Sequence, residues 1–168
     1  MEGNIRFSTQ IKEEDLYRYN LHHAYTSMQG IFSILISALL LVTWALQFEK
    51  LSSVYVVLYP VIAILFLCYI PANLKLKSKQ QMSQEVFKHP LDYELCDTCI
   101  RVSSITCEEE SELPLEYIYK VVVWKEYLLI YTNRVNAYIV PQKDISGIYD
   151  SVKEYFKNHL EDYKLSIK

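Results

Sequence analysis

Two long runs of uncharged, mostly apolar residues dominate the pattern of hydrophobic and polar positions. Residues 30–48 read GIFSILISALLLVTWALQF and residues 54–70 read VYVVLYPVIAILFLCYI, and neither run contains Asp, Glu, Lys or Arg. At about 1.5 Å per residue, a helix of either length spans roughly the hydrocarbon core of a bilayer. A helix of a soluble protein would show a polar face every three or four residues, which both runs lack. Only five residues separate the runs, so they predict an antiparallel hairpin of two membrane spans over residues 30–71.

Prolines and aromatic residues refine this expected hairpin. Pro60 lies inside the second run and predicts a kink, and Pro71 is expected to close the span. Aromatic residues lie near both ends, as in the interfacial belts of membrane proteins: Tyr25 and Tyr69 near one interface, and Trp44 and Tyr55 near the other.

The segment before the first run changes its period part-way. Apolar and polar residues alternate from Ile5 to Ile11, which predicts a half-buried strand. Apolar residues then recur at helical spacing from Tyr17 to Met28, after an acidic stretch at residues 13–15 that suits the first turn of a helix. Residues 1–29 are therefore expected to form a strand and a juxtamembrane helix that runs on into the first span.

The pattern after the second run becomes that of strands. Residues 72–88 are a polar, basic connector, expected to continue the second helix. The short stretch from Cys96 to Cys99 then joins two alternating segments, which is typical of a hairpin. Further strands are expected at residues 105–112, 120–124, 127–131 and 136–140. They follow one another too closely for helical crossovers, so the sheet is expected to be antiparallel.

The final segment returns to helical spacing. One apolar stripe runs along it, with Ser146 as the expected N-cap. The stripe consists of Ile148, Val152, Tyr155, Phe156, Leu160 and Tyr163. The expected fold class is therefore a two-span membrane α-helical hairpin plus an α+β domain over residues 89–168. This domain is predicted to be an antiparallel barrel like that of pleckstrin-homology (PH) domains, capped by the C-terminal helix.

Basic residues close to the two runs predict the orientation, because they resist translocation across a membrane. Lys75, Lys77 and Lys79 follow the second run, Lys12 and Arg18 precede the first, and the intervening loop has only Lys50. Both termini are thus expected in the cytoplasm, with the chain a multi-pass membrane protein. The three lysines after the second run either contact anionic lipid headgroups or serve only as a topology signal, and both interpretations stay open.

Composition and missing motifs exclude several function classes. The 168 residues carry a formal net charge of -3, without the basic excess that nucleic-acid binding leaves. The chain has only three glycines, and no catalytic triad, HExxH or nucleotide loop is recognisable. Both apolar runs lack the ionisable residues that a transport path needs. We therefore expect no enzyme, no cofactor and no small-molecule substrate.

Three cysteines form the one candidate for metal or redox chemistry. Cys96 and Cys99 have the spacing of half a zinc site or of a redox dithiol, and Cys107 is a potential third ligand. A structural zinc site needs four ligands, and no second pair of cysteines is present. A redox dithiol of the thioredoxin type would open a helix, and no helix is indicated here. These residues are low-ranked metal candidates.

The chain resembles the YcxB-like family of small bacterial membrane proteins over nearly its whole length. The segments that carry the resemblance are IRFSTQIKEEDLYRYNLHHAY, the two-run hairpin, YELCDTCIRV, SELPLEYIYKVVVWKEYLLIYT and AYIVPQKDI. The most specific part is the order of Pro114, the strand from Tyr117 to Trp124, and Ile139 to Pro141 with Lys143. The resemblance implies a PH-like cytoplasmic domain on a membrane hairpin in the bacterial plasma membrane, and it provides no known catalytic residues to carry over to this chain. The pair Cys96 and Cys99 departs from the family pattern.

Two hypotheses of function follow. The first is a membrane protein whose PH-like domain is a binding or scaffolding module, with the lipid bilayer and either another protein or a second copy of itself as partners. The alternative is a thiol- or metal-responsive membrane sensor that uses Cys96, Cys99 and Cys107.

Overall fold

The computed structural model describes residues 4–104 and 107–167, without the side chains of residue 86 and residues 107–110. The chain divides into two compact units. We call residues 1–16 together with 81–168 the sheet unit, and residues 17–80 the hairpin unit. The sheet unit is therefore assembled from both ends of the sequence, with the hairpin unit inserted between them.

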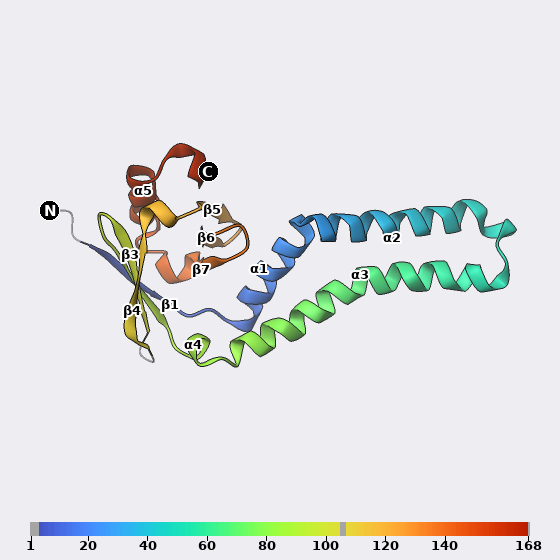
Figure 1. The fold of residues 1–168 in the computed structure, drawn as a ribbon, viewed down its shortest axis with the longest axis horizontal. Helices are drawn as coiled ribbons and strands as arrows, with labels where there is room; N and C mark the ends of the chain where they lie inside the picture. The colour runs from blue at the N-terminus through green and yellow to red at the C-terminus, as the bar shows by residue number, and fades with distance from the viewer. Residues whose placement is uncertain (1–3, 105–106, 168) are drawn as a thin grey trace. The chain divides into compact units, whose positions relative to one another are not determined.

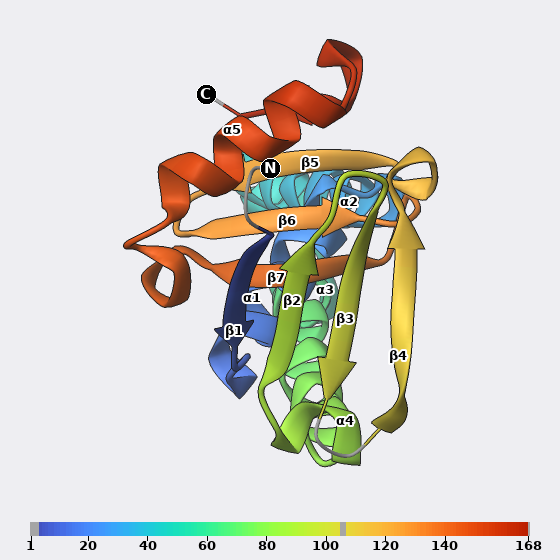
Figure 2. The same ribbon diagram turned by 90° about the vertical axis from the view of Figure 1, so that its left-hand side faces the viewer.

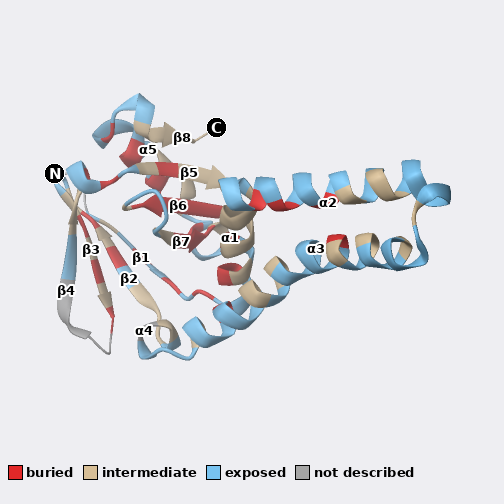
Figure 3. Cartoon of the chain, turned by 45° about the vertical axis from the view of Figure 1, so that its right-hand side comes forward, coloured by how far each residue is buried: buried red, intermediate tan, exposed pale blue. Residues whose placement is uncertain are grey.

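The hairpin unit is built from three helices. They are α1 (Glu13–Thr26), α2 (Met28–Gln47) and α3 (Ser53–Met82), and the short 3-10 helix η1 (Phe48–Lys50) lies between the last two. Both α2 and α3 are long and apolar enough to cross a membrane. Most of the apolar residues of both helices are exposed, as Figure 3 shows, which agrees with the absence of a polar face in the two apolar runs.

Helix α1 does not run on into α2, which corrects the expectation of one continuous helix. The chain breaks at Ser27, whose backbone is extended and whose hydroxyl accepts a hydrogen bond from the N–H of Gly30 at 3.3 Å. This is an N-cap, and it starts a new helix. A Cβ atom on Gly30 would lie 2.1 Å from the carbonyl oxygen of Ala24, so only glycine allows the two helices to meet at this corner.

Helix α3 continues through Pro71 instead of ending there, and Figure 1 shows that it bends along its length. A proline frees the carbonyl four residues before it, which for Pro60 is that of Val56 and for Pro71 that of Leu67. Both carbonyls receive a side-chain donor from outside α3. Trp44 donates from Nε1 to Val56 O at 2.8 Å, and Tyr25 donates its hydroxyl to Leu67 O at 3.4 Å. Because these donors replace the missing N–H groups, the helix tolerates both prolines.

Small side chains bring α2 and α3 together along the rest of the hairpin. Gly30, Ser33 and Ser37 are the buried residues of α2, and Ala63 is fully buried on α3. The Ser33 hydroxyl donates to the carbonyl of Phe66 at 3.3 Å. Small and hydroxyl-bearing residues are typical of packed helices in apolar surroundings, where they permit close approach.

The first sheet of the sheet unit includes a strand from before the hairpin unit. Its order is β1 (Ile5–Thr9), β2 (Leu91–Leu95), β3 (Cys99–Ser104) and β4 (Cys107–Pro114), all antiparallel. The one-turn helix α4 (Glu85–Lys88) precedes β2. In β1 and β2, Ile5 pairs with Leu95 and Thr9 with Leu91. A domain that begins at residue 89, as predicted, therefore omits β1, the first strand of the sheet. The alternating pattern of residues 5–11 predicts a strand but does not show which distant strand it pairs with.

The second sheet has the order β7 (Ala137–Pro141), β6 (Tyr127–Tyr131), β5 (Lys120–Trp124) and β8 (Leu165–Ser166). Strand β8 is parallel to β5 and was not predicted. Figure 2 shows the strands of the two sheets crossing one another, with α5 (Tyr149–His159) along one end. The described strands form two separate sheets and not the closed barrel expected. The 3-10 helix η2 (Leu115–Tyr117) separates β4 from β5, and β8 occupies one outer edge.

Helix α5 covers the core with most of the predicted stripe. Val152 and Phe156 are fully buried, and Tyr155 and Leu160 are nearly so, within a cluster that joins both sheets. Two details of the prediction are wrong. The 3-10 helix η3 (Gln142–Ile145) precedes the helix, so Ile148 and not Ser146 occupies the N-cap. Tyr163 is 79% exposed, because the chain leaves α5 and forms the 3-10 helix η4 (Asp162–Lys164).

The beginning of α1 belongs to the sheet unit and is held there by Asp15. This buried carboxylate accepts a hydrogen bond from the N–H of Lys12 at 3.0 Å and from the hydroxyl of Tyr127 at 2.8 Å. The first bond is half of a capping box, and the second fixes the helix start to β6. The acidic first turn therefore has a structural role beyond its favourable interaction with the helix dipole.

Candidate functional site

A cleft of about 300 Å³ lies between α5, the turn that joins β2 to β3, and the beginning of β1. We call it the α5 cleft. Its lining residues come from three separate parts of the sequence: Asn4, Ile5, Leu95, Asp97, Ser151, Glu154, Tyr155, Asn158 and His159. The stripe that buries α5 leaves the neighbouring polar positions of the helix facing this opening.

Tyr155 fixes the α5 cleft by joining the helix to the β2–β3 turn. Its hydroxyl donates to the carbonyl oxygen of Cys96 at 2.5 Å, and its ring stacks on that of His159 with 4.4 Å between centroids. Burial raises the pKa of Tyr155, so the hydroxyl remains a protonated donor at all physiological pH values. The turn is closed by the hydrogen bond from Cys96 N–H to Cys99 O at 2.9 Å.

The charges around the α5 cleft are of one sign. Asp97 and Glu154 are exposed at its rim, and among the described residues that line it there is no Lys or Arg. The half-buried Ile5 and buried Leu95 provide an apolar floor. A groove with an apolar floor and an acidic rim suits a long cationic side chain, whose stem contacts the floor while its head meets the carboxylates.

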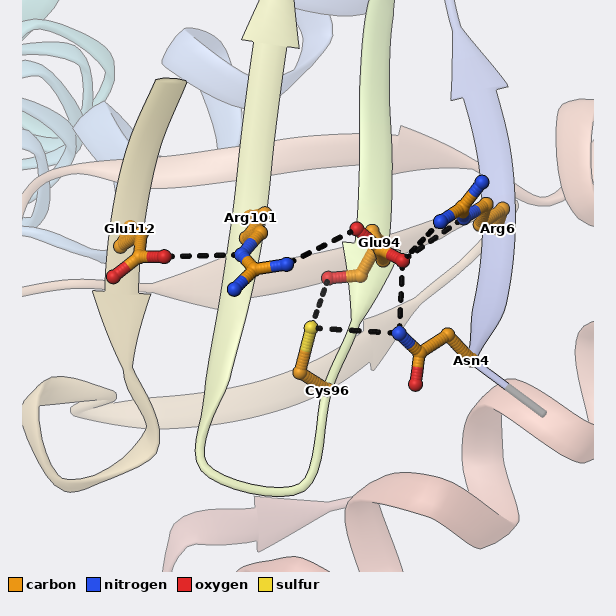
Figure 4. A network of polar contacts seen from close by, with 6 residues as sticks. All are labelled: Asn4, Arg6, Glu94, Cys96, Arg101 and Glu112. Atoms are coloured by element: carbon orange, nitrogen blue, oxygen red, sulfur yellow. Dashed lines mark hydrogen bonds and ion pairs between the residues drawn. The ribbon is translucent and has the colours of Figure 1, made fainter. Parts of the chain in front are cut away.

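A row of alternating charges crosses the outer face of the first sheet next to this cleft (Figure 4). Arg6, Glu94, Arg101 and Glu112 occupy paired positions on the four successive strands. Arg6 Nη2 lies 2.6 Å from Glu94 Oε1. Arg101 lies between two carboxylates, with its Nη1 3.6 Å from Glu94 Oε2 and its Nε 3.0 Å from Glu112 Oε1. Since the row contains equal positive and negative charge, it neutralises itself and stabilises the pairing of the strands.

Glu94 is the centre of this row. It also accepts a hydrogen bond from the side-chain amide of Asn4 at 2.8 Å. The hydrogen bonds from Asn4 and Arg6 hold the pKa of the Glu94 carboxyl below its usual value. Asn4 lines the α5 cleft as well, so the charge row positions one wall of that cleft.

The predicted cysteine site is only partly described. Cys96 and Cys99 are half-buried free thiols at the two ends of the turn, and Cys107 lies outside the residues whose side chains are described. The Cys96 sulfur lies 4.0 Å from Asn4 Nδ2 and 3.9 Å from Glu94 O. Burial raises the pKa of the Cys96 thiol, whereas reactive and ligating cysteines need a stabilised thiolate. Within the described part of the chain, no group of three or more His, Cys, Asp or Glu side chains converges as a metal site.

The three predicted lysines lie on α3 of the hairpin unit and are not among the residues that line the α5 cleft. Lys75, Lys77 and Lys79 are all exposed. Of the three, Lys77 lines a separate pocket within the hairpin unit, and Lys75 and Lys79 do not line it. The structure therefore distinguishes lysines that the sequence could only treat as a group.

Sequence reasoning did not identify the α5 cleft. Ser151, Asn158 and His159 are ordinary polar residues of an amphipathic helix, and no motif marks them. The contact between β1 and the β2–β3 turn depends on the pairing of β1 with β2, two strands that the whole hairpin unit separates in the sequence. The one available signal was the exposed acidic Asp97 in the hairpin turn.

Comparison of the chain with known proteins gives no match to a family model, to a curated protein or to a solved structure.

Proposed function

We propose that this chain is an integral membrane protein whose sheet unit is a cytoplasmic, PH-like, non-enzymatic module that binds a protein partner. The observation that carries the proposal is the α5 cleft, which combines an acidic rim with an apolar floor. The favoured ligand is a Lys or Arg side chain presented by the partner. The alternative of a thiol- or metal-responsive sensor is disfavoured by the raised pKa of the Cys96 thiol.

The order of elements supports the PH-like interpretation. Four antiparallel strands, then three antiparallel strands and a C-terminal helix, follow one another along the sheet unit. Two features depart from that arrangement: the hairpin unit is inserted between the first and second strands, and the short strand β8 follows the helix. The resemblance to YcxB-like proteins agrees with this organisation, and with it we place the protein in the bacterial plasma membrane.

The pairing of β1 with β2 supports a multi-pass hairpin with both flanks on one side of the membrane. These strands lie before α2 and after α3, and they cannot pair across a bilayer. The concentration of basic residues in the flanks favours the cytoplasm for that side. A cysteine introduced at Ser52 should then react with an impermeant maleimide added to intact cells, and one introduced at Ser166 should not. The reverse labelling pattern would refute the orientation.

Site-specific photocrosslinking in native membranes tests the binding proposal. A photoreactive amino acid replaces Asn158, which lines the α5 cleft, or Lys157, the exposed neighbour on another face of the helix. We expect a discrete protein adduct from position 158 and none from position 157. Glu154→Lys, which reverses a charge on the rim, should abolish that adduct and leave the amount of protein in the membrane unchanged.

Two results would count against the proposal. Equal adducts from positions 157 and 158 would mean that the partner does not occupy the α5 cleft. An adduct that persists at full strength in the Glu154→Lys variant would exclude recognition of a cationic side chain by the acidic rim.

A further inference from the structure

We propose that a second pocket, within the hairpin unit, binds the phosphate-bearing headgroup of an anionic phospholipid. The pocket has a volume of about 360 Å³ and is lined by α1, the beginning of α2, and α3. This inference rests on the proposed membrane location of α2 and α3. It names a ligand and a site that are independent of the α5 cleft.

Two helices form the walls of the pocket, and their lining residues have the same spacing along the sequence. Helix α1 contributes Asn20, His23 and Ala24, with Ser27 at its end, and α3 contributes Ile70, Asn73, Leu74 and Lys77. Each set has the spacing i, i+3, i+4, i+7, which places its members on one face of a helix. The two faces are opposed, and Gln29, Gly30 and Tyr69 complete the lining.

The pocket changes from apolar to cationic along its length. Ile70 and Gly30 belong to the uncharged segments of α3 and α2. On α3 the first polar lining residue after Ile70 is Asn73, and Lys77 lies one helical turn further along. In a membrane protein this change marks the passage from the hydrocarbon region to the headgroups. A ligand that matches it has an apolar end and an anionic end, as a phospholipid has.

The positive end of the pocket has donors and no competing acid. Lys77 and His23 carry the basic groups, Asn20 and Asn73 supply amides, and among the described lining residues there is no Asp or Glu. Within the described part of the chain Lys77 makes no hydrogen bond or ion pair with another residue. An ammonium group in such surroundings favours a phosphate as its ligand. Lysine binds phosphate as a concentrated positive charge that also donates hydrogen bonds.

Specific contacts hold the walls of this pocket in place. The side-chain amide of Asn20 donates to the hydroxyl of the fully buried Ser78 at 3.1 Å, which joins α1 to α3 beside Lys77. The Ser27 cap and the glycine at position 30 fix the corner between α1 and α2. The helix break that the sequence did not predict therefore creates the pocket.

Lys75 provides a matched control for Lys77. Both lysines are exposed on the same helix, and they differ by two positions, so they point to different faces. A headgroup attracted only by general surface charge would be weakened equally by either substitution, about fivefold for each basic residue removed near an anionic surface. A headgroup bound in the pocket would respond to Lys77 alone.

The experiment is native mass spectrometry of the purified full chain released from nanodiscs. The discs contain phosphatidylcholine with increasing phosphatidylglycerol, and separate samples contain glycerol 3-phosphate in place of phosphatidylglycerol. We expect one phosphatidylglycerol to be retained per chain, and Lys77→Gln to weaken its retention roughly fivefold or more. Lys75→Gln should have no such effect.

Each alternative outcome overturns the inference in a recognisable way. Equal weakening by Lys75→Gln and Lys77→Gln would show general surface attraction. Retention of glycerol 3-phosphate as strongly as the lipid would identify a soluble phosphate as the ligand. Retention of phosphatidylcholine as strongly as phosphatidylglycerol would show that the anionic charge is not recognised. If the chain instead failed to incorporate into nanodiscs at all, the proposed membrane location would be wrong.

Discussion

Single residues in this protein act mainly through the groups that face them, and Glu94 is the clearest example. It pairs with two arginines and accepts a hydrogen bond from Asn4, so its carboxylate is favoured in the folded chain. In the unfolded chain these contacts are lost and the pKa returns to about 4.3. The folded state therefore gains stability from Glu94 only while the carboxylate is ionised.

This pKa difference predicts the response of the sheet unit to acid. The contribution of Glu94 is constant from neutral pH down to the unfolded-state pKa and is lost as pH falls through the lowered folded-state pKa. Glu94→Gln should therefore flatten the acid side of the stability profile, measured by denaturant unfolding of the full chain in micelles from pH 7 to pH 3. Glu116→Gln is the control, because the Glu116 carboxylate has no partner among the described residues. Identical acid sensitivity of the wild type and the Glu94→Gln variant would contradict the assignment.

At the scale of elements, α3 shows how a helix with two internal prolines is stabilised by its neighbours. The carbonyls freed by Pro60 and Pro71 are bonded to Trp44 and Tyr25. These aromatic residues were expected near the membrane interfaces, and their positions also fix how α3 aligns with α2 and α1. A buried carbonyl without a partner would otherwise destabilise the hairpin.

A double-mutant cycle tests this compensation. Trp44→Phe removes the donor to Val56 and should destabilise the hairpin by about 0.6 to 2 kcal/mol through the lost hydrogen bond, in addition to lost packing. In a Pro60→Ala background the new N–H at position 60 satisfies the same carbonyl, so Trp44→Phe should be less harmful there. Unfolding in mixed detergent and SDS micelles measures both backgrounds. Equal effects in the two would show that the tryptophan bond does not compensate for the proline.

Helix α5 gives the second prediction at this scale. Phe156 is fully buried against both sheets, and an aspartate there would leave a cavity and an unpaired buried charge. Phe156→Asp should therefore unfold the sheet unit, with a loss of at least about 3 kcal/mol. Lys157→Glu, one residue along on the exposed face, should change stability by no more than about 0.5 kcal/mol.

Limited proteolysis and gel filtration of the full chain in detergent distinguish these variants. A folded, monomeric Phe156→Asp protein that had lost only its crosslinked partner would mean that the stripe binds a ligand and does not form the core.

At the scale of the whole molecule, the sheet unit is one fold whose sequence is interrupted by the hairpin unit. The ring of Phe7 in β1 stacks on that of Tyr93 in β2, with 5.0 Å between their centroids, and both rings belong to the core. A fragment that begins near residue 85 lacks β1 and exposes one edge of β2 together with this part of the core. Unpaired edges and uncovered apolar surface promote aggregation.

Reuniting the two parts of the sheet unit tests its independence. We expect residues 1–16, joined by a flexible Gly/Ser linker to residues 81–168, to give a soluble monomer with a cooperative thermal transition. Residues 85–168 alone should aggregate or lack that transition, as measured by gel filtration and circular dichroism. A stable monomer from residues 85–168 with the same transition temperature would show that β1 is dispensable.

Some elements of this fold are determined by a few neighbouring residues, and others depend on residues far apart in the sequence. The strands at residues 120–124 and 127–131 and the apolar face of α5 are found where periodicity places them, because the pattern of a few residues determines each. The two apolar helices are likewise evident from composition. The partner of β1, the α5 cleft and the break at Ser27 depend on residues far apart in the sequence or on one tight backbone contact, and neither leaves a periodic signal.

The position of β1 ahead of the hairpin also has a consequence for biosynthesis. The ribosome releases β1 first, but its partner β2 is made only after both apolar helices have emerged. In the membrane topology proposed above, the nascent chain must therefore keep an unpaired strand until the hairpin has entered the bilayer and turned back. A chain whose second helix failed to insert would leave β1 and β2 on opposite sides of the membrane. Completion of the sheet would thus report correct insertion, and chains that failed this step would remain open to proteolysis.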